Sequence, residues 1–386
     1  MSEHNDNAQP EGERTPVRID LQQLLEAVQA HGQKTVDQQD EAAKDGQYDD
    51  AILDSSAIAP TDDEGNPVPV TIPIVLAPGV TVVYTTRLGG VSEGDFAHFN
   101  LGAKGGDLPE RVRRNREALA NELHARISLV NQVHSATPVD LDDLYEENAA
   151  YGFNASGMRV PGDPVEVDAV DRVSDDGTIQ VIDADAQVTT RTGIALGVFA
   201  ADCLPVLLAD PEAGVTAAAH AGRKGLVDGV IDATVDMMVD KGAQRGRIVA
   251  TLGPAICGDC YEVGDEIADA FDAVFPGTFT LTRFGGPGID INKAALIALA
   301  KAGVDADRVF SSQPRVNAAT QYLSHDAELE ELCREDNEGD PALAERLGHI
   351  RHSMCTLENP LWFSHRRAQL AQKPHEGRML ALIVRR

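Results

Sequence analysis

Two histidines and one cysteine stand where strands are expected to end, and together they could hold a metal ion. His134 closes a run of β-favouring residues, Cys203 follows a second run, and His220 follows a third, among alanines and beside a glycine. The turn formers of residues 210–214 predict a hairpin that brings Cys203 close to His220. Two imidazoles and a thiolate are natural zinc ligands, and three protein ligands leave a fourth position open, as in catalytic sites. We therefore expect a catalytic zinc site at these residues, with copper as the other metal that suits them.

The same residues also permit chemistry without a metal. A cysteine becomes a nucleophile when a neighbouring histidine takes up its proton, so Cys203 and His220 could serve a cysteine hydrolase. Cys257 and Cys260 form a further C-x-x-C pair, but no second pair follows at the spacing of a zinc ribbon. We expect these two cysteines to pack within a loop. The glycine-rich residues 284–288 lack the lysine of a phosphate-binding loop and are interpreted as a turn.

The elements that position these residues follow from hydrophobic periodicity and turn formers. Strands are expected at residues 81–86, 127–134, 194–199, 206–209, 215–219, 247–252, 362–364 and 378–384. Helices are expected at residues 107–125, 226–240, 263–275, 290–303 and 326–336, with Asp107 and Asp290 as N-caps. This mixture indicates an α/β or α+β protein, and the order of the strands cannot be read from it.

Acidic residues are concentrated in two segments of a chain whose formal net charge is −29. Residues 1–70 hold 16 Asp and Glu against 4 Lys and Arg, and residues 140–176 hold 11 against 2. We interpret residues 1–70 as an acidic, largely disordered tail and residues 71–386 as a single catalytic domain. Residues 138–178 are interpreted as an acidic insertion folded onto the surface, or a loop. A surface adapted to high salt would instead be acidic throughout.

Charge and composition also argue against several partners and locations. A chain this negative has no nonspecific attraction to nucleic acid or anionic lipid. The longest apolar stretch, residues 194–209, is interrupted by Asp202 and Pro205 and is too short to cross a bilayer. The N-terminus is acidic where a secretory signal would be basic and then apolar, and five cysteines do not suggest a disulfide scaffold. We expect a cytoplasmic protein with reduced thiols that binds neither nucleic acid nor membranes.

Several short motifs lie in order over residues 81–386. They are TTRLGGVSEG (85–94), FNLG (99–102), NQVHS (131–135), AADCLPVLLAD (200–210), AAAHAGRKGL (217–226), LGPAICGDCYEVG (252–264), CT (355–356), FSHRR (363–367) and GRM (377–379). With these motifs the sequence resembles the multi-substrate purine nucleoside phosphorylases, formerly described as polyphenol oxidases or laccase-domain proteins. The resemblance implies that His134, Cys203 and His220 are the metal ligands. It also implies an α+β fold of mixed, sandwich-like β-sheets flanked by helices.

The resemblance further implies phosphorolysis of purine nucleosides and of methylthioadenosine, and deamination of adenosine, at a zinc site. Zinc lowers the pKa of a bound water to about 7, which suits deamination. Asp202, beside a metal ligand, is the candidate proton shuttle, and a structural cap is its other interpretation. Inorganic phosphate needs fixed cations, for which Arg87 is the first candidate and Arg366 the second. Asn100 and Gln132 are candidates for binding ribose hydroxyls or base edges.

Two motifs depart from the family pattern. Arg223 and Lys224 stand where the family has Trp and Arg after AHAG, and His365 replaces the Tyr of FSYRR. A cation therefore replaces a ring that could wall the cleft, so substrate preference could differ. The acidic tail and the insertion have no counterpart in the pattern.

Other functions compete with the nucleoside enzyme. One is a copper-dependent polyphenol oxidoreductase, although one mononuclear site offers nowhere to store the four electrons that reduce oxygen to water. A metal-free cysteine hydrolase using Cys203 is another. The last is a non-catalytic factor that acts through the acidic tail, whose protein partners are unknown.

Overall fold

Two six-stranded sheets packed face to face form the centre of the protein. The computed structural model describes residues 61–147, 150–157, 181–335 and 343–386. The first sheet contains, in spatial order, β1 (Thr71–Ala77), β2 (Val80–Thr85), β14 (Met379–Arg385), β7 (Ile194–Ala200), β3 (Arg126–Val130) and β5 (Gly152–Ala155). The second contains β13 (Val309–Phe310), β10 (Val249–Leu252), β8 (Leu204–Asp210), β9 (Val215–Ala221), β6 (Ala186–Thr189) and β4 (Pro138–Asp140). Each sheet combines parallel and antiparallel neighbours, which confirms the expected mixed sheets.

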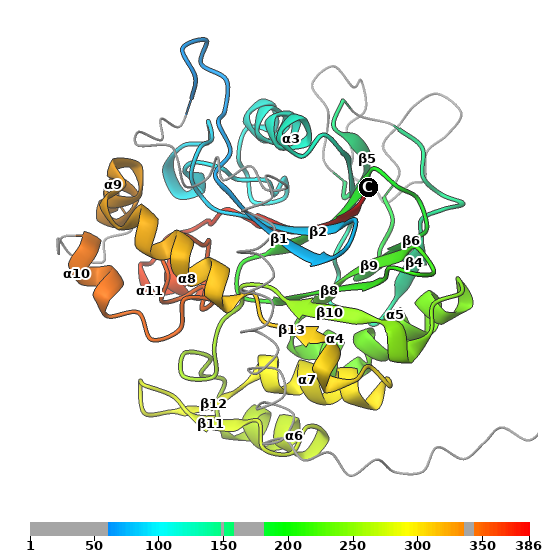
Figure 1. The fold of residues 1–386 in the computed structure, drawn as a ribbon. Helices are drawn as coiled ribbons and strands as arrows, with labels where there is room; N and C mark the ends of the chain where they lie inside the picture. Colours follow the sequence, from blue (N-terminus) through cyan, green and yellow to red (C-terminus); the bar gives the residue numbers. More distant parts are fainter. Residues whose placement is uncertain (1–60, 148–149, 158–180, 336–342) are drawn as a thin grey trace, which may run out of the picture.

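Alternation of side chains along the strands produces the layers of the fold. In β8, Val206 and Leu208 belong to the core beneath the helices, whereas Leu207 packs into the core between the two sheets. Helix α3 (Pro109–Leu123) covers the outer face of the first sheet. Helices α5 (Val230–Asp240) and α7 (Ile291–Lys301) cover the outer face of the second sheet (Figure 1). This sequence of layers confirms an α+β sandwich flanked by helices.

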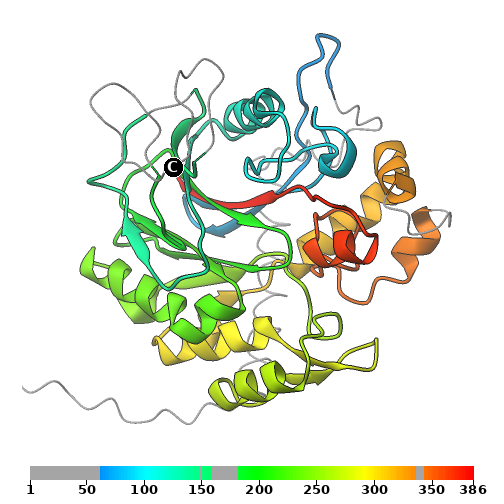
Figure 2. The ribbon, with the colours of Figure 1, turned by 180° about the vertical axis from the view of Figure 1, so that it is seen from behind.

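The other elements lie around this sandwich. They are η1 (Gly94–Phe96), α4 (Arg223–Asp228), η2 (Arg245–Arg247), α6 (Asp265–Val274), β11 (Phe279–Leu281), β12 (Pro287–Ile289), η3 (Ala306–Arg308), α8 (Gln313–Tyr322), η4 (Leu323–His325), α9 (Ala327–Glu335), α10 (Leu343–Gly348) and α11 (His365–Leu370). Helices α8 to α11 gather at one side of the sandwich, as Figure 2 shows from behind. None of the helices in the described residues is long and apolar enough to span a bilayer.

Two expectations about helices are wrong in their details. Asp107 does not cap α3, because the N-cap is Leu108 and the buried Asp107 carboxylate accepts hydrogen bonds from the side chains of Ser92 and Asn100. The helix expected over residues 226–240 is two helices, α4 and α5, which meet at Gly229. The φ of 90° at that glycine lies in the left-handed region, where an α-helix cannot continue.

The expected strand at residues 362–364 is also wrong. Ser364 instead caps α11, since its Oγ accepts a hydrogen bond from the Arg367 backbone N–H. By contrast, the expected cap of α7 is confirmed, because Asp290 Oδ1 accepts from the Lys293 backbone N–H at 3.0 Å.

The segment interpreted as an acidic insertion contributes to both sheets. Within it, residues 138–140 form β4 and residues 152–155 form β5. Both are edge strands of three or four residues, too short for alternation to reveal them. Of the expected tail, residues 1–60 lie outside the described residues, while Val70 is buried and exchanges backbone hydrogen bonds with the chain at residues 86–88.

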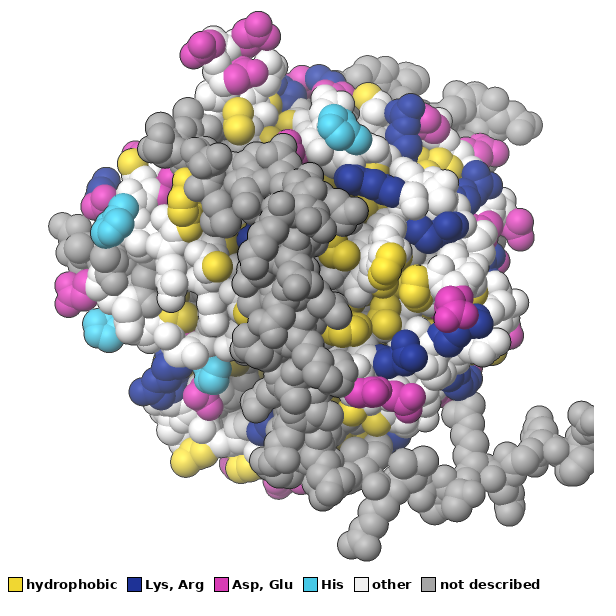
Figure 3. All heavy atoms as spheres, viewed as in Figure 1, with side chains coloured by type: hydrophobic (Ala, Val, Ile, Leu, Met, Phe, Trp, Pro, Cys, Tyr) yellow, Lys and Arg dark blue, Asp and Glu magenta, His cyan; other side chains and the backbone are white. Residues whose placement is uncertain are grey.

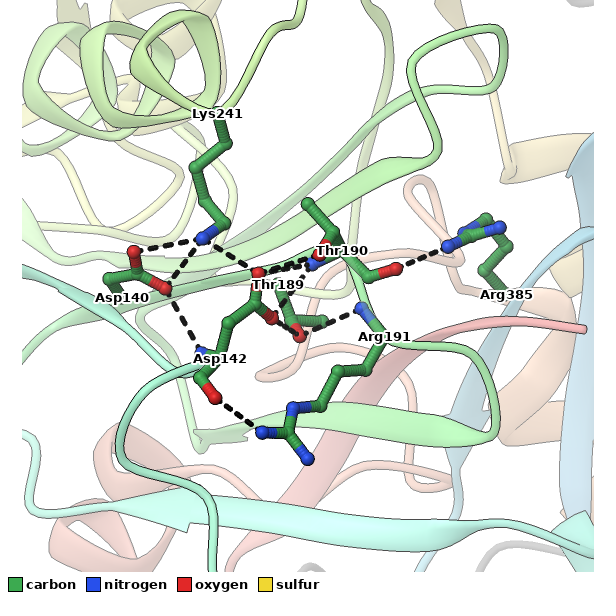
Figure 4. Close-up of polar contacts among 7 residues, drawn as sticks. All are labelled: Asp140, Asp142, Thr189, Thr190, Arg191, Lys241 and Arg385. Carbon is green, nitrogen blue, oxygen red and sulfur yellow. Dashed lines mark hydrogen bonds and ion pairs between the residues drawn. The ribbon is translucent and has the colours of Figure 1, made fainter.

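The start of this acidic segment is held by a cation and by threonines (Figure 4). Lys241, at the end of α5, lies 2.8 Å from Asp140 and 2.7 Å from Asp142. The Asp142 carboxylate also accepts hydrogen bonds from the side chains of Thr189 and Thr190. Burial alone would raise the pKa of Asp142, but Lys241 and the threonines lower it well below its usual value. These contacts join β4, the end of β6 and the end of α5.

We expect Asp142→Asn to lower the free energy of unfolding by about 1–3 kcal/mol, because partly buried donors lose a charged acceptor. The pKa of Asp142 is lower in the folded than in the unfolded chain, where it is about 3.9. Its contribution is therefore present above about pH 4 and disappears as the pH falls through the folded value. Urea unfolding at pH 7 and pH 3 measures this difference. The neighbouring Asp143, which is exposed, supplies the control Asp143→Asn, and equal effects of both variants would contradict the prediction.

Charges of both signs are interspersed on the face drawn in Figure 3. Lys and Arg side chains lie there among Asp and Glu side chains of the described residues. This face lacks the uniformly acidic character of a surface adapted to high salt.

Candidate metal centre

Three parallel strands bring three chain crossings to one edge of the sandwich. Strands β5, β3 and β7 are parallel neighbours in the first sheet, so their carboxyl ends meet. From β3 the chain crosses through residues 131–137 to β4, and from β7 it crosses through residues 201–203 to β8. Residues 181–185 lie beside Asn131 through a parallel bridge and lead into β6. All the crossings connect the first sheet with the second, and the candidate metal ligands lie on them or next to them.

His134, Cys203 and His220 converge at this edge. Cys203 Sγ lies 3.7 Å from His134 Nε2, and the ring centroids of the two histidines are 4.8 Å apart. One donor atom from each residue lies within 4.8 Å of the others. The β8–β9 register pairs Leu204 with Ala221, which confirms the expected hairpin and places Cys203 beside His220. His220 is buried and His134 is exposed, so the cluster is reached from solvent on the His134 side.

A buried carboxylate that the sequence did not single out organises two of these ligands. Asp185 Oδ1 accepts a hydrogen bond from His220 Nδ1 at 2.8 Å and one from the His134 backbone N–H at 3.0 Å. Its Oδ2 accepts from the backbone N–H and the hydroxyl of Ser135. Because Asp185 binds Nδ1 of His220, Nε2 of that ring is left to face the thiol. No motif marks Asp185, which lies in an ordinary run of acidic and small residues.

The charges of the cluster depend on one another. Burial would raise the pKa of the Cys203 thiol, but His220 and His134 lower it to about 6. Burial would lower the pKa of His220, but Cys203 and Asp185 raise it to about 9. Burial likewise opposes ionisation of Asp185, yet the hydrogen bonds from His220 and Ser135 lower its pKa to about 2. At neutral pH the cluster therefore contains a thiolate, which is the form that binds metals, beside a protonated His220 ring, which would release its proton as a metal binds. Two imidazoles, one thiolate and a carboxylate that orients a ring fit a zinc site.

Gly222 leaves the space in which two of the ligands meet. A Cβ atom at this position would lie 3.0 Å from Cys203 Sγ and 3.1 Å from His134 Cδ2. Both contacts are closer than ordinary van der Waals distance, so a side chain here displaces a ligand. This packing accounts for the glycine that follows His220 and Ala221.

We expect Gly222→Ala to weaken metal binding about 10–100-fold, because overpacking costs about 1–3 kcal/mol. Titration of the metal-free protein with zinc measures the change. Gly246→Ala is the matched control, since the nearest heavy atom to its new Cβ would be 4.0 Å away. Unchanged affinity in Gly222→Ala would show that the ligands tolerate the methyl group.

Similarity to known proteins agrees with this geometry. A family model described as multi-copper polyphenol oxidoreductase laccase matches residues 81–334. The chain belongs to this family. Over 224 residues it is 41% identical to purine nucleoside phosphorylase ORF3 of Streptomyces griseus, covering 57% of this chain and 79% of that protein. Adenosine deaminase RL5, from an unknown prokaryotic organism, is 37% identical over 195 residues, covering 50% of this chain and 70% of that protein. The solved structure of a Neisseria meningitidis protein, NMB0706, is 29% identical with a TM-score of 0.56, covering 83% of this chain and 99% of that one.

Three other predicted residues of this laccase-family chain use their side chains within the fold. The Gln132 amide exchanges two hydrogen bonds with the backbone of Phe199 and so continues the pairing of β3 with β7. Asn100 is buried, and its amide bonds to the backbone of Gly102, to the Arg378 backbone N–H and to Asp107. The Arg87 guanidinium is also buried, over the ring of Phe363 at 5.2 Å from its centroid.

Asp202 adjoins the cluster but is already hydrogen bonded. Its Oδ1 accepts from the hydroxyls of Thr356 and Ser364, both at 2.6 Å, and its Oδ2 accepts from the Arg366 backbone N–H at 2.6 Å. The φ of Asp202 is 94°, in the left-handed region that few side chains adopt. The Asp202 carboxylate thereby holds the start of α11, and this contact resembles the structural cap that was the alternative to a proton shuttle.

Two arginines and the thiol of Cys203 act electrostatically on Tyr261. The Arg366 guanidinium lies 5.6 Å from the ring centroid of Tyr261 and donates to the Glu262 carbonyl. Burial raises the pKa of Tyr261, and the nearby Cys203 raises it further, whereas Arg223 and Arg366 oppose this rise. Arg223 is the residue that departs from the family pattern, and it begins α4 directly after Gly222. The comparison with the family motif drew attention to Arg223, whereas no motif predicted a role for Tyr261.

Proposed function

We propose that the protein is a zinc-dependent purine nucleoside phosphorylase that also deaminates adenosine and cleaves methylthioadenosine. The observation that carries the proposal is the open three-ligand centre of His134, Cys203 and His220, present in a chain whose relatives are named purine nucleoside phosphorylase and adenosine deaminase. A closed structural site would need a fourth protein ligand, and the described residues supply only three here.

In this proposal each residue has a distinct task. A bound zinc ion would supply a water whose pKa is about 7. Asp185 holds the His220 ring by its Nδ1 atom and fixes the turn that carries His134. Arg223 and Arg366 bind inorganic phosphate, because Arg223 directly follows Gly222, which lies against Cys203, and the Arg366 guanidinium lies 5.6 Å from the ring centroid of Tyr261. Asp202 acts as a positioning residue for α11 rather than as the proton shuttle, since its carboxylate already accepts three hydrogen bonds.

The reacting atoms of the substrate add a geometric requirement. Deamination occurs at C6 of the purine, whereas phosphorolysis occurs at C1′ of the ribose, at the opposite end of the nucleoside. One metal cannot lie beside both atoms in a single binding pose. We therefore propose that substrates bind in two orientations, with the arginines nearest the ribose during phosphorolysis.

Phosphate dependence is the decisive experiment. Purified protein is incubated with adenosine or inosine, with and without inorganic phosphate, and the products are separated by chromatography. We expect ribose 1-phosphate and free base only when phosphate is present, and inosine from adenosine in both conditions. Metal analysis of the same preparation should find zinc. Absence of ribose 1-phosphate would refute phosphorolysis, and copper with phenol oxidation would favour the oxidoreductase that the family description names.

A cysteine hydrolase is a second candidate, which one specific arrangement favours. Cys203, His220 and Asp185 form a chain of thiol, imidazole and carboxylate, and the pKa of the thiol is about 6. Such a chain can activate a thiolate nucleophile without a metal. His134 has no task in that mechanism, and this difference provides the test described in the Discussion.

A further inference from the structure

A second group of metal-binding side chains lies apart from the first centre. Cys257 and Cys260 belong to the loop between β10 and α6, and they are joined there by Cys355 and Glu358 from a segment almost a hundred residues further on. One donor atom from each of the four residues lies within 4.8 Å of the others. The C-x-x-C pair therefore has partners, although they do not occur at ribbon spacing.

The spacing of the donor atoms matches tetrahedral coordination. Glu358 Oε1 lies 3.4 Å from Cys257 Sγ and 3.6 Å from Cys260 Sγ. Around zinc, with Zn–S near 2.3 Å and Zn–O near 2.0 Å, a tetrahedral arrangement separates sulfur from oxygen by about 3.5 Å. The existing positions of these atoms thus need little adjustment to accept the ion.

The carboxylate of this cluster is held in place by its surroundings. Arg283 Nη2 donates to Oε1 of Glu358 at 2.6 Å, and the Arg351 backbone N–H donates to Oε2 at 2.7 Å. The Glu358 side chain is only 3% exposed. Ligating carboxylates are typically fixed by such outer hydrogen bonds, which set the direction of the ligand atom.

Burial and ligand number favour a structural site. Cys260 and Cys355 are fully buried, and the Cys257 backbone N–H donates to Cys355 Sγ at 3.4 Å. Four protein ligands close a tetrahedral site, so no position is left for substrate. Three thiolates suit zinc or copper(I), and the hard carboxylate oxygen favours zinc.

We propose that Cys257, Cys260, Cys355 and Glu358 bind a second zinc ion, which fastens the loop before α6 to the C-terminal segment. Backbone hydrogen bonds already join Ala255 to residues 354 and 356. The loop carries Tyr261, and the segment carries Thr356, whose hydroxyl donates to Asp202. The second ion therefore fixes the loop that carries Tyr261 and the segment that holds Asp202, which precedes Cys203 in the chain, and it does so without contacting substrate. The thiol protons are released to solvent as the ion binds.

Metal content separates this site from the first one and does not depend on the proposed function. The full-length His134→Ala protein, purified under reducing conditions with zinc, should retain one zinc per chain, whereas the unaltered protein should hold two. With cobalt in place of zinc, His134→Ala should keep a strong thiolate-to-cobalt charge-transfer band. Adding Cys355→Ser to His134→Ala should abolish that band and the retained zinc, while Cys333→Ser, a cysteine outside both clusters, should change neither.

Several results would overturn the proposal. One is His134→Ala protein that contains no bound metal, and another is copper in place of zinc. A third is a disulfide among Cys257, Cys260 and Cys355, detected by counting free thiols after denaturation without reductant. If Cys355→Ser fails to fold, Glu358→Gln provides the second variant. We expect it to keep the three thiolates and to bind zinc more weakly, whereas unchanged affinity would remove Glu358 from the ligand set.

Discussion

Replacing His134 with alanine should remove the zinc proposed for the first centre and lower kcat/KM for nucleosides by about 10³-fold, or about 4 kcal/mol of transition-state stabilisation. Only Cys203 and His220 would then be left as ligands, and two ligands hold zinc poorly in an open site. Because the His134 side chain is exposed, we expect the free energy of unfolding of the metal-free protein to change by less than about 0.5 kcal/mol.

Metal content and steady-state kinetics of His134→Ala, measured together, check this expectation. His349→Ala is the matched control, since His349 is an exposed histidine outside both clusters. A variant that holds one zinc per chain fewer than the unaltered protein, yet still turns over substrate at the full rate, would refute the zinc mechanism. Cys203, His220 and Asp185 would then be assigned as a hydrolase triad.

Asp185→Asn should lower the zinc affinity of the catalytic centre by about 10–100-fold, the usual cost of losing a carboxylate behind a metal-bound histidine. The asparagine side chain has nearly the same shape, but its amide nitrogen cannot accept a hydrogen bond. Either His220 Nδ1 or the turn at Ser135 therefore loses its acceptor. Binding of the metal then requires the His220 ring to be oriented without that support.

Saturating zinc distinguishes positioning from general damage to the fold. We expect excess zinc to restore most of the kcat of Asp185→Asn, which a merely unfolded protein would not show. Asp183→Asn is the control, because Asp183 bonds to the side chain of Asn131 on the same chain crossing but touches no ligand. The pKa of Asp185, about 2, lies below its unfolded value, so its contribution to stability is present above about pH 4 and is lost as the pH falls toward 2. Failure of excess zinc to restore kcat would assign Asp185 a role beyond orienting His220.

Local patterns predicted the hairpin that carries two of the ligands. Strands β8 and β9 are apolar runs separated by a four-residue turn, so their pairing follows from nearby residues alone. The cap at Asp290 is similarly local. The left-handed φ at Gly229 could not be predicted, because a glycine inside a helical pattern is compatible with either a continuous or a broken helix.

Long-range pairing is what the sequence left undetermined. The parallel alignment of β3 with β7 brings His134 to Cys203, and nothing near either residue specifies that alignment. The same holds for Asp185, which reaches His220 only because residues 181–185 pair beside Asn131. Cys355 meets Cys257 through a bridge between segments a hundred residues apart. The resemblance in motifs predicted His134, Cys203 and His220 as metal ligands, whereas the contact of Asp185 with His220 depends on long-range pairing.

A zinc ion bound at the proposed catalytic centre would also hold the two sheets together, because its ligands come from the chain crossings between them. His134 lies on the crossing that follows β3 of the first sheet, whereas His220 belongs to β9 of the second sheet, so an ion bound by both would tie the two layers together. Separation of the layers must then expel the ion, and the stability of the sandwich rises with the free zinc concentration as RT ln(1 + [Zn]/Kd). At a thousand times Kd this amounts to about 4 kcal/mol, so zinc limitation would lower the resistance of the whole fold to heat and proteolysis.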